Sequence, residues 1–169
     1  MIMFRRVFLA AAVSGLLLGA CEQKRPAPDA TYYLVRHAEK TMETPDPALT
    51  LKGQTRAEDL ATRLKDVKLT AIYSSDYKRT RDTAAPIAET QGLEVKLYKP
   101  GALPEFSELL KQETGDILVV GHSNTTGELS ELIGGPKGEP IIEATEYDRL
   151  YILERAGDVV TGRIEHYGE

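Results

Sequence analysis

The sequence predicts an α/β fold, a three-layer sandwich in which a mostly parallel central sheet has helices on both faces and an antiparallel edge. From Thr31 onward, short apolar runs alternate with amphipathic segments, as in a parallel sheet covered on both sides. Residues 117–120 form a continuous apolar run, which is typical of a buried central strand. Two extended segments around Gly157 and Asp158 predict a terminal hairpin, which supplies the antiparallel edge.

The first half of the predicted domain contains two strands and two helices. The strands are expected at 31–35 and 71–73, and the two prolines in 41–47 indicate a loop. Thr50 can cap a helix whose apolar residues recur at helical spacing through Leu64. A second helix is expected from Tyr77 to Gln91, closed by Gly92.

The second half continues the alternation and ends in strands. A third strand is expected at 94–98, followed by a helix that has Pro104 at its first position and an apolar face formed by Phe106, Leu109 and Leu110. After the central strand, residues 125–128 have the spacing of a capping box, which predicts a further helix. Strands at 149–154 and 159–166 complete the domain.

The N-terminal residues read as an export signal. Arg5 and Arg6 precede an apolar stretch, 7–18, that is shorter than a membrane-spanning helix requires. Residues 18–21, Leu-Gly-Ala-Cys, resemble a bacterial lipobox, in which the cysteine is acylated. We therefore expect a signal peptide at 1–20, a lipidated Cys21 with a tether through residue 30, and one domain at 31–169. The protein is expected to be an exported lipoprotein, held on the membrane through Cys21 and facing the periplasm.

Composition narrows the range of partners. Without residues 1–20, 19 basic residues stand against 26 acidic ones, a net charge of −7 that argues against a nucleic-acid partner. Cys21 is the only cysteine, so no disulfide is expected. Neither a cofactor nor a bound metal is expected, and the sequence leaves the oligomeric state open.

Two predicted strands end at histidines. Arg36 and His37 follow the first strand, and His122 follows the central strand. Between them, residues 75–84 form a basic segment that opens a helix and contains Arg79. Because open α/β sheets build their sites at the carboxyl ends of the strands, these side chains should meet in one crevice. Two arginines and two histidines are suited to a phosphate group.

The motifs resemble those of the histidine phosphatase superfamily, also called phosphoglycerate-mutase-like. Its Arg-His-Gly signature is similar to residues 36–38, with Ala38 at the glycine position, and its Leu-Thr-x-x-Gly segment is similar to 49–57. Its second arginine segment corresponds to 75–84, and its second histidine to His122. The matches run in order from Thr31 to about Ile133.

This resemblance implies a phosphomonoester hydrolase that works without a metal, acts on a small phosphorylated substrate and forms a phosphohistidine on His37. It implies catalytic roles for Arg36, Arg79 and His122 as well. The proton donor is expected to be Glu105, with Glu39 as the alternative. If neither donates, the proton comes from an acid in Glu143–Asp148 or from the substrate itself. The further residues expected at the substrate are Glu39, Ser75, Ser123 and Asn124.

Other functions remain open at this point. A noncatalytic lipoprotein that binds a phosphorylated ligand would use the same arginines and histidines. A phosphohistidine protein phosphatase fits the small size, although its cytoplasmic substrates conflict with an export signal. A metal hydrolase is a weaker rival: His37 and Glu39 have an H-x-E spacing, but the Pro-Cys-x-x-Cys segment of zinc deaminases is absent from the sequence.

Overall fold

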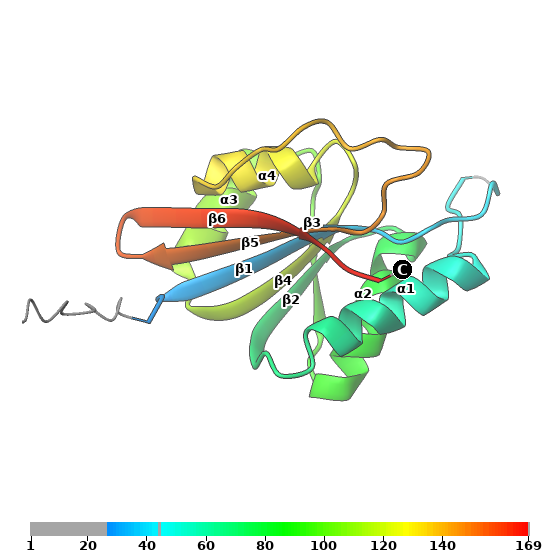
Figure 1. The fold of residues 1–169 in the computed structure, drawn as a ribbon, viewed down its shortest axis with the longest axis horizontal. Coiled ribbons are helices and arrows are strands. Elements are labelled where there is room, and N and C mark those ends of the chain that lie inside the picture. Colours follow the sequence, from blue (N-terminus) through cyan, green and yellow to red (C-terminus); the bar gives the residue numbers. More distant parts are fainter. Residues whose placement is uncertain (1–26, 44, 169) are drawn as a thin grey trace, which may run out of the picture.

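The computed structural model describes residues 27–168 apart from residue 44, and its centre is a six-stranded sheet (Figure 1). The strands are β1 (Ala30–Arg36), β2 (Leu69–Ser75), β3 (Val95–Tyr98), β4 (Gly115–Gly121), β5 (Arg149–Ala156) and β6 (Val159–His166). Their order across the sheet is β3-β2-β4-β1-β5-β6. The first four in that order are parallel to one another, whereas β5 and β6 pair in the antiparallel sense. The mostly parallel sheet with an antiparallel edge is therefore confirmed.

Four helices cover the two faces of this sheet (Figure 1). They are α1 (Leu51–Arg63), α2 (Lys78–Gln91), α3 (Leu103–Gln112) and α4 (Thr126–Ile133). Side chains from α3 and α4 join one buried cluster with Tyr32, Leu34 and Val119 of the sheet. Side chains from α1 and α2 join another with Val35 and Leu118. Alternate residues of β1 and β4 thus enter opposite layers, as expected for strands buried on both faces.

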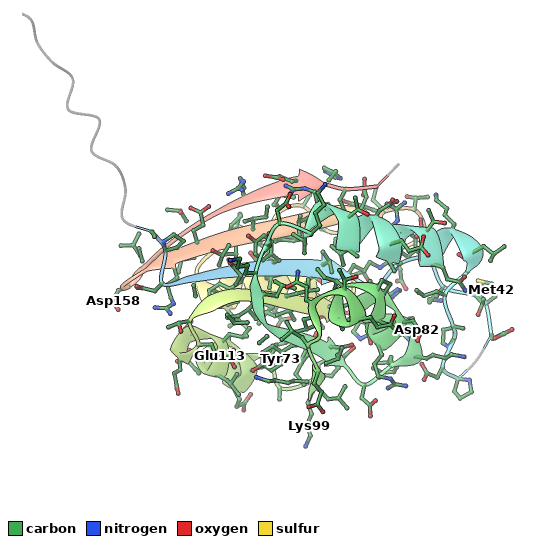
Figure 2. All side chains as sticks on the ribbon, turned by 90° about the horizontal axis from the view of Figure 1, so that it is seen from below. Met42, Tyr73, Asp82, Lys99, Glu113 and Asp158 are labelled. Atoms are coloured by element: carbon green, nitrogen blue, oxygen red, sulfur yellow. The ribbon has the colours of Figure 1, made fainter. Side chains whose placement is uncertain are left out.

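The helix ends follow the predicted signals. The Thr50 side chain accepts a hydrogen bond from the Gly53 amide, so it caps α1 as expected. Gly92 ends α2 in the left-handed region at φ 65°, where glycine carries no steric penalty. The loop between β1 and α1 and the tip of the β5–β6 hairpin lie at opposite ends of the molecule, marked by Met42 and Asp158 (Figure 2). The parallel strands therefore end on the Met42 side.

Two predicted details are wrong. Leu109 is 45% exposed, because the buried face of α3 consists of Leu103, Phe106, Ser107 and Leu110. The Ser107 hydroxyl donates to the Pro104 carbonyl oxygen, which satisfies this polar group inside the apolar face. The capping box is also absent, since the Thr125 side chain forms no cap bond to α4.

The start of the domain also needs a correction. Ala30 is already the first residue of β1 and is buried, and the Asp29 amide donates to the Arg155 carbonyl oxygen at 2.7 Å. The end of the predicted tether therefore belongs to the sheet. The predicted signal peptide, Cys21 and residues 22–26 lie outside the described residues. In the described part of the chain, no helix has the length and apolarity needed to cross a bilayer.

Candidate active site

The two histidines lie next to each other because their strands are neighbours in the sheet. Arg36 is in register with Gly121, and each is followed by its histidine. The His37 amide donates to the Gly121 carbonyl oxygen at 2.9 Å, which extends the β1–β4 ladder by one bond. The two imidazole centroids are 5.5 Å apart, and both rings are buried. The predicted convergence of the two strand ends is present in the structure.

His37 is held as a neutral imidazole with one free nitrogen. Its Nδ1 is 2.8 Å from the Ala38 carbonyl oxygen, and since a carbonyl can only accept, Nδ1 carries the proton. The pKa of His37 is lowered to about 3, mainly by burial and then by the charges of Arg36, His122 and Arg79, against the opposing effect of the Ala38 bond. The unprotonated Nε2 of His37 is therefore a nucleophile at neutral pH.

His122 is oriented by hydrogen bonds on both ring nitrogens. Nη2 of Arg79 lies 3.4 Å from Nδ1, and the Ser75 hydroxyl lies 2.8 Å from Nε2. Because the guanidinium donates to Nδ1, Nε2 carries the proton and donates to Ser75. Ser75 in turn donates to the Thr80 hydroxyl at 3.1 Å. Burial, followed by the charges of Arg79 and Arg36, lowers the pKa of His122 to about 4.

The missing capping box has a local explanation at this histidine. The His122 amide donates to the Thr125 hydroxyl oxygen at 3.0 Å, so Thr125 bonds backward to the residue that follows β4. Thr126 also donates to the His122 carbonyl oxygen at 2.8 Å. The two threonine side chains therefore bond to the backbone of His122. In a capping box, a side chain would instead bond to the free amides at the start of α4.

Arg36 is a buried cation with unused donors. Its Nη1 donates to the Glu146 carbonyl oxygen at 2.9 Å, and its Cζ lies 4.1 Å from the centroid of the Tyr147 ring. Among the described residues, its Nε and Nη2 have no hydrogen-bond partner. Burial lowers the pKa of Arg36, although a guanidinium keeps its charge at neutral pH. Buried donors without partners are costly, so they indicate a place for an anion.

Arg79 provides the second cation. Its Cζ lies 4.4 Å from the Tyr77 ring centroid, and its Nη1 lies 3.8 Å from a carboxylate oxygen of Asp46. Its Nε is buried without a partner in the described part of the chain. Arg79 also lines a cavity of about 450 Å³ together with His37 and His122. Arg36 is not among the residues that line this cavity.

The cavity contains some of the expected substrate-binding residues and not others. Ser123 and Asn124 line it. Ser75 is fully buried behind His122 and acts on that ring. Glu39 also points elsewhere: its carboxylate accepts hydrogen bonds from Nε and Nη2 of Arg56. Burial opposes ionisation of Glu39, but the Arg56 bonds outweigh it, so the net effect is a lowered pKa.

Glu105 is exposed in the first turn of α3 and does not line the cavity. Glu143 is the one carboxylate among the described residues that line it, and it comes from the segment between α4 and β5. The sequence offered only a weak signal for Glu143, since its segment has no periodic pattern. No group of three or more His, Cys, Asp or Glu side chains suited to a metal ion occurs within residues 27–43 and 45–168.

Sequence similarity covers much of the chain. Residues 32–100 match the sequence model of the histidine phosphatase superfamily (branch 1). A protein named "Probable phosphoglycerate mutase GpmB" from Escherichia fergusonii is 34% identical over 131 residues, covering 68% of this chain and 57% of that protein. A GpmB protein of Escherichia coli is 41% identical over 70 residues, covering 37% of this chain and 33% of that protein. The chain thus spans less than two thirds of these curated relatives.

Solved structures share the fold at low sequence identity. The protein histidine phosphatase SixA, in complex with tungstate, has a TM-score of 0.62 at 18% identity, covering 81% of this chain and 95% of that one. A mycobacterial glucosyl-3-phosphoglycerate phosphatase has a TM-score of 0.61 at 15% identity, covering 81% of this chain and 97% of that one. Solved structures such as SixA share its fold, and by its sequence the chain belongs to the histidine phosphatase superfamily, with phosphoglycerate-mutase-like relatives.

Proposed function

We propose that the protein is a metal-independent phosphomonoester hydrolase that forms a phosphohistidine on His37. The observation that carries this proposal is the neutral His37 imidazole, which lines one cavity with Arg79 and His122. The unpartnered donors of Arg36 and Arg79 supply what a phosphate dianion needs, charge together with directed N–H groups. The superfamily assignment supports the same chemistry.

The first step transfers the phosphoryl group to the protein. Nε2 of His37 forms a bond to phosphorus while the bond from phosphorus to the ester oxygen breaks. Arg36 and Arg79 stabilise the negative charge on the nonbridging oxygens. A bound dianion favours the protonated form of His122, whose Nδ1 can then donate to the phosphoryl group. In the second step, water attacks the phosphorus and releases inorganic phosphate and neutral His37.

Glu143 is the group that we propose as the proton donor in the first step. It lines the cavity, whereas the carboxylate of Glu39 is held by Arg56 and Glu105 is exposed away from the cavity. Protonated Glu143 would deliver its proton to the departing ester oxygen. The resulting carboxylate would then accept a proton from the attacking water, which restores the starting state.

Chemical trapping tests the nucleophile. Full-length protein mixed briefly with a labelled phosphomonoester should carry a label that is stable to base and lost in acid, as expected for a phosphoramidate. His37→Asn should abolish the label and the turnover. His166→Asn is the matched control, because His166 is exposed and bonded to Asp148. Label retained by His37→Asn would refute the assignment of the nucleophile. Loss of activity in a strong chelator would refute the proposed metal independence.

The proton donor is tested by varying the leaving group. Glu143→Gln should slow hydrolysis of an alkyl phosphate by about 10²-fold or more, in the range typical of general acid catalysis. It should change hydrolysis of nitrophenyl phosphate far less, because nitrophenolate departs without a proton. Glu105→Gln serves as the control, since Glu105 is an exposed glutamate away from the cavity. An equal loss on both substrates would contradict a proton-donating role for Glu143.

We also propose that the enzyme acts outside the cytoplasm, anchored through a lipid on Cys21. The support is the order of a basic segment, an apolar stretch and a lipobox-like Cys21 in the sequence. The described domain begins only a few residues after Cys21, which leaves a short connection between a membrane surface and β1.

A further inference from the structure

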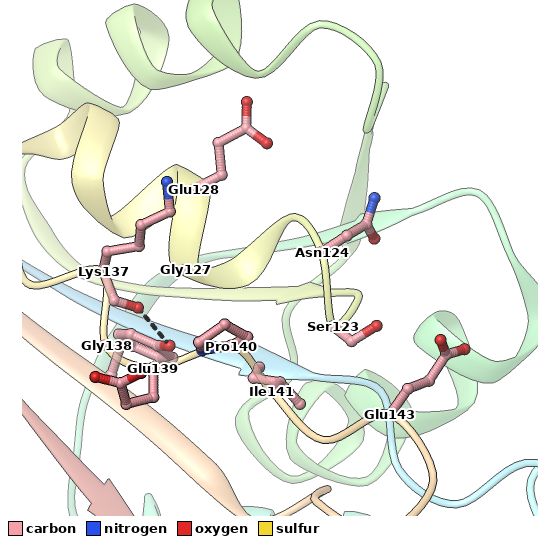
Figure 3. A pocket seen from close by; sticks show the side chains of 11 residues that line it. Ser123, Asn124, Gly127, Glu128, Lys137, Gly138, Glu139, Pro140, Ile141 and Glu143 are labelled. Atoms are coloured by element: carbon pink, nitrogen blue, oxygen red, sulfur yellow. Dashed lines mark hydrogen bonds between the residues drawn. The ribbon is translucent and has the colours of Figure 1, made fainter.

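A second cavity, of about 370 Å³, adjoins the cavity lined by His37, Arg79 and His122 (Figure 3). The two cavities share three lining residues: Ser123, Asn124 and Glu143. In Figure 3 these residues lie at one end of the second cavity, and Lys137 and Glu139 lie toward the other. A group bound to His37 and Arg79 thus has a continuous path past Glu143 into this second space.

The walls of the second cavity are held by packing and hydrogen bonds. The Tyr151 hydroxyl donates to the Lys137 carbonyl oxygen at 2.9 Å and accepts from Nη1 of Arg149 at 3.1 Å. Next to them, a Cβ added at Gly127 would lie 2.8 Å from the same Lys137 carbonyl oxygen and 3.3 Å from the Tyr151 hydroxyl oxygen. The start of α4 and Lys137 therefore pack closely, and only a residue without a side chain fits at position 127 without displacing its neighbours.

The lining of this cavity combines apolar surface with negative charge. Pro140, Ile141 and the Tyr151 ring supply the apolar part. The cavity also contains Glu128 and Glu139, and no ion pair of either carboxylate occurs among the described residues. The one cation in the lining, Lys137, is paired at 2.8 Å with Glu131, which lies outside the cavity. Two lining carboxylates, Glu128 and Glu139, thus stand against one lining cation, so these three residues carry a net negative charge.

We infer that this second cavity binds the leaving group of the substrate and selects an uncharged or cationic alcohol with an apolar body. The inference rests on the proposed phosphatase function. In this arrangement the phosphate occupies the cavity lined by His37 and Arg79, and the ester oxygen faces Glu143. The alcohol then enters the second cavity, which Ile141 and Tyr151 line. A leaving group with its own carboxylate or a further phosphate is disfavoured by Glu128 and Glu139.

A series of matched esters tests the charge selection. The phosphate esters of tyramine, para-ethylphenol and para-hydroxyphenylacetate share one aromatic body and differ in charge. The ratio of kcat/KM between the tyramine and hydroxyphenylacetate esters should be about fivefold or more, since exposed carboxylates contribute modestly. The double variant Glu128→Gln, Glu139→Gln should bring this ratio close to one, while Glu105→Gln should preserve it. A wild-type ratio near one, or a ratio unchanged in the double variant, would overturn the inference.

Filling the cavity tests its occupancy. Ile141→Trp should raise KM for para-ethylphenyl phosphate severalfold, and by a clearly larger factor than any change for methyl phosphate, which has no body to place there. Ile142→Trp is the control, because the neighbouring Ile142 is 64% exposed and lines neither cavity. Equal kinetics of both variants on the aryl ester would refute the leaving-group site while leaving the phosphatase function intact. Absence of hydrolysis of every ester by the wild type would instead refute the phosphatase function, and this inference with it.

Discussion

Removing Arg79 should disable the site far more than removing its near neighbour Arg81. The Arg79 side chain is 15% exposed and contacts His122, whereas the Arg81 side chain is 42% exposed and pairs with Asp76. Two charge-assisted hydrogen bonds to a phosphoryl group contribute about 3–6 kcal/mol, at about 1.5–3 kcal/mol each. Arg79→Ala should therefore lower kcat/KM by about 10²-fold or more, as loss of an oxyanion donor does.

The comparison needs two further variants. Arg81→Ala should cost under about 1 kcal/mol, because surface ion pairs contribute little. Arg79→Lys keeps the charge but loses the two-pronged geometry, so its activity should lie between wild type and Arg79→Ala. Steady-state kinetics at limiting substrate measures kcat/KM, and urea unfolding checks that each variant is folded. Similar losses in Arg79→Ala and Arg81→Ala would refute the placement of Arg79 at the phosphate.

Three other predictions follow from the packing, the burial of the histidines and the N-terminus. Gly53→Ala should destabilise the domain by about 1–3 kcal/mol in urea unfolding, because the added Cβ would overlap the Glu39 carbonyl oxygen; unchanged stability would contradict this close approach. Burial lowers the pKa of His37 to about 3 and of His122 to about 4, so below the ordinary value of 6.5 the unfolded chain binds more protons than the folded one. The free energy of unfolding should therefore fall as the pH drops from 7 toward 4, by up to roughly 2 kcal/mol per imidazole at pH 5, and His122→Asn should reduce this slope. Cys21→Ser should abolish fatty-acid labelling and release the protein from membranes, whereas wild-type protein that is unlabelled and soluble would rule out the anchor.

The strands could be predicted because the apolar pattern of each segment in the sequence matches the faces on which the strand is buried. Residues 117–120 are apolar at every position, and the strand that they form is covered on both faces at the centre of the sheet. Helix ends could be predicted where one residue determines the geometry, as Thr50 and Gly92 do. The face of α3 could not, since a buried Ser107 with an internal hydrogen bond looks polar in the sequence, and Leu109 looks apolar.

Four residues of the candidate site could be predicted because each ends a strand, follows a strand or lies in the first turn of a helix. The positions of Arg36, His37, Arg79 and His122 depend on elements that the sequence defines well. The position of Glu143 depends instead on a segment placed by tertiary bonds such as that between Tyr151 and the Lys137 carbonyl oxygen. These contacts join residues that no local pattern relates.

The ion pair between Arg56 and Glu39 could not be predicted from the sequence. Arg56 lies inside α1, and its side chain is buried and bonded to Glu39, which follows β1 by three residues. The sequence shows that both residues exist, but only the packing of α1 beside the end of β1 brings them together. A carboxylate that is chosen as a proton-donor candidate by its chain position alone can therefore turn out to belong to a structural ion pair.

The bond from the His37 amide to the Gly121 carbonyl oxygen joins the proposed nucleophile to the central β1–β4 ladder. Amides in a central ladder exchange with solvent only when the whole domain opens, whereas segments without regular structure open locally. Residues 134–148, which carry Glu143 and Ile141, contain neither helix nor strand. As denaturant is added, hydrolysis of nitrophenyl phosphate, whose leaving group departs without a proton from Glu143, should therefore persist to the global transition. Hydrolysis of alkyl phosphates and discrimination between larger substrates should be lost earlier.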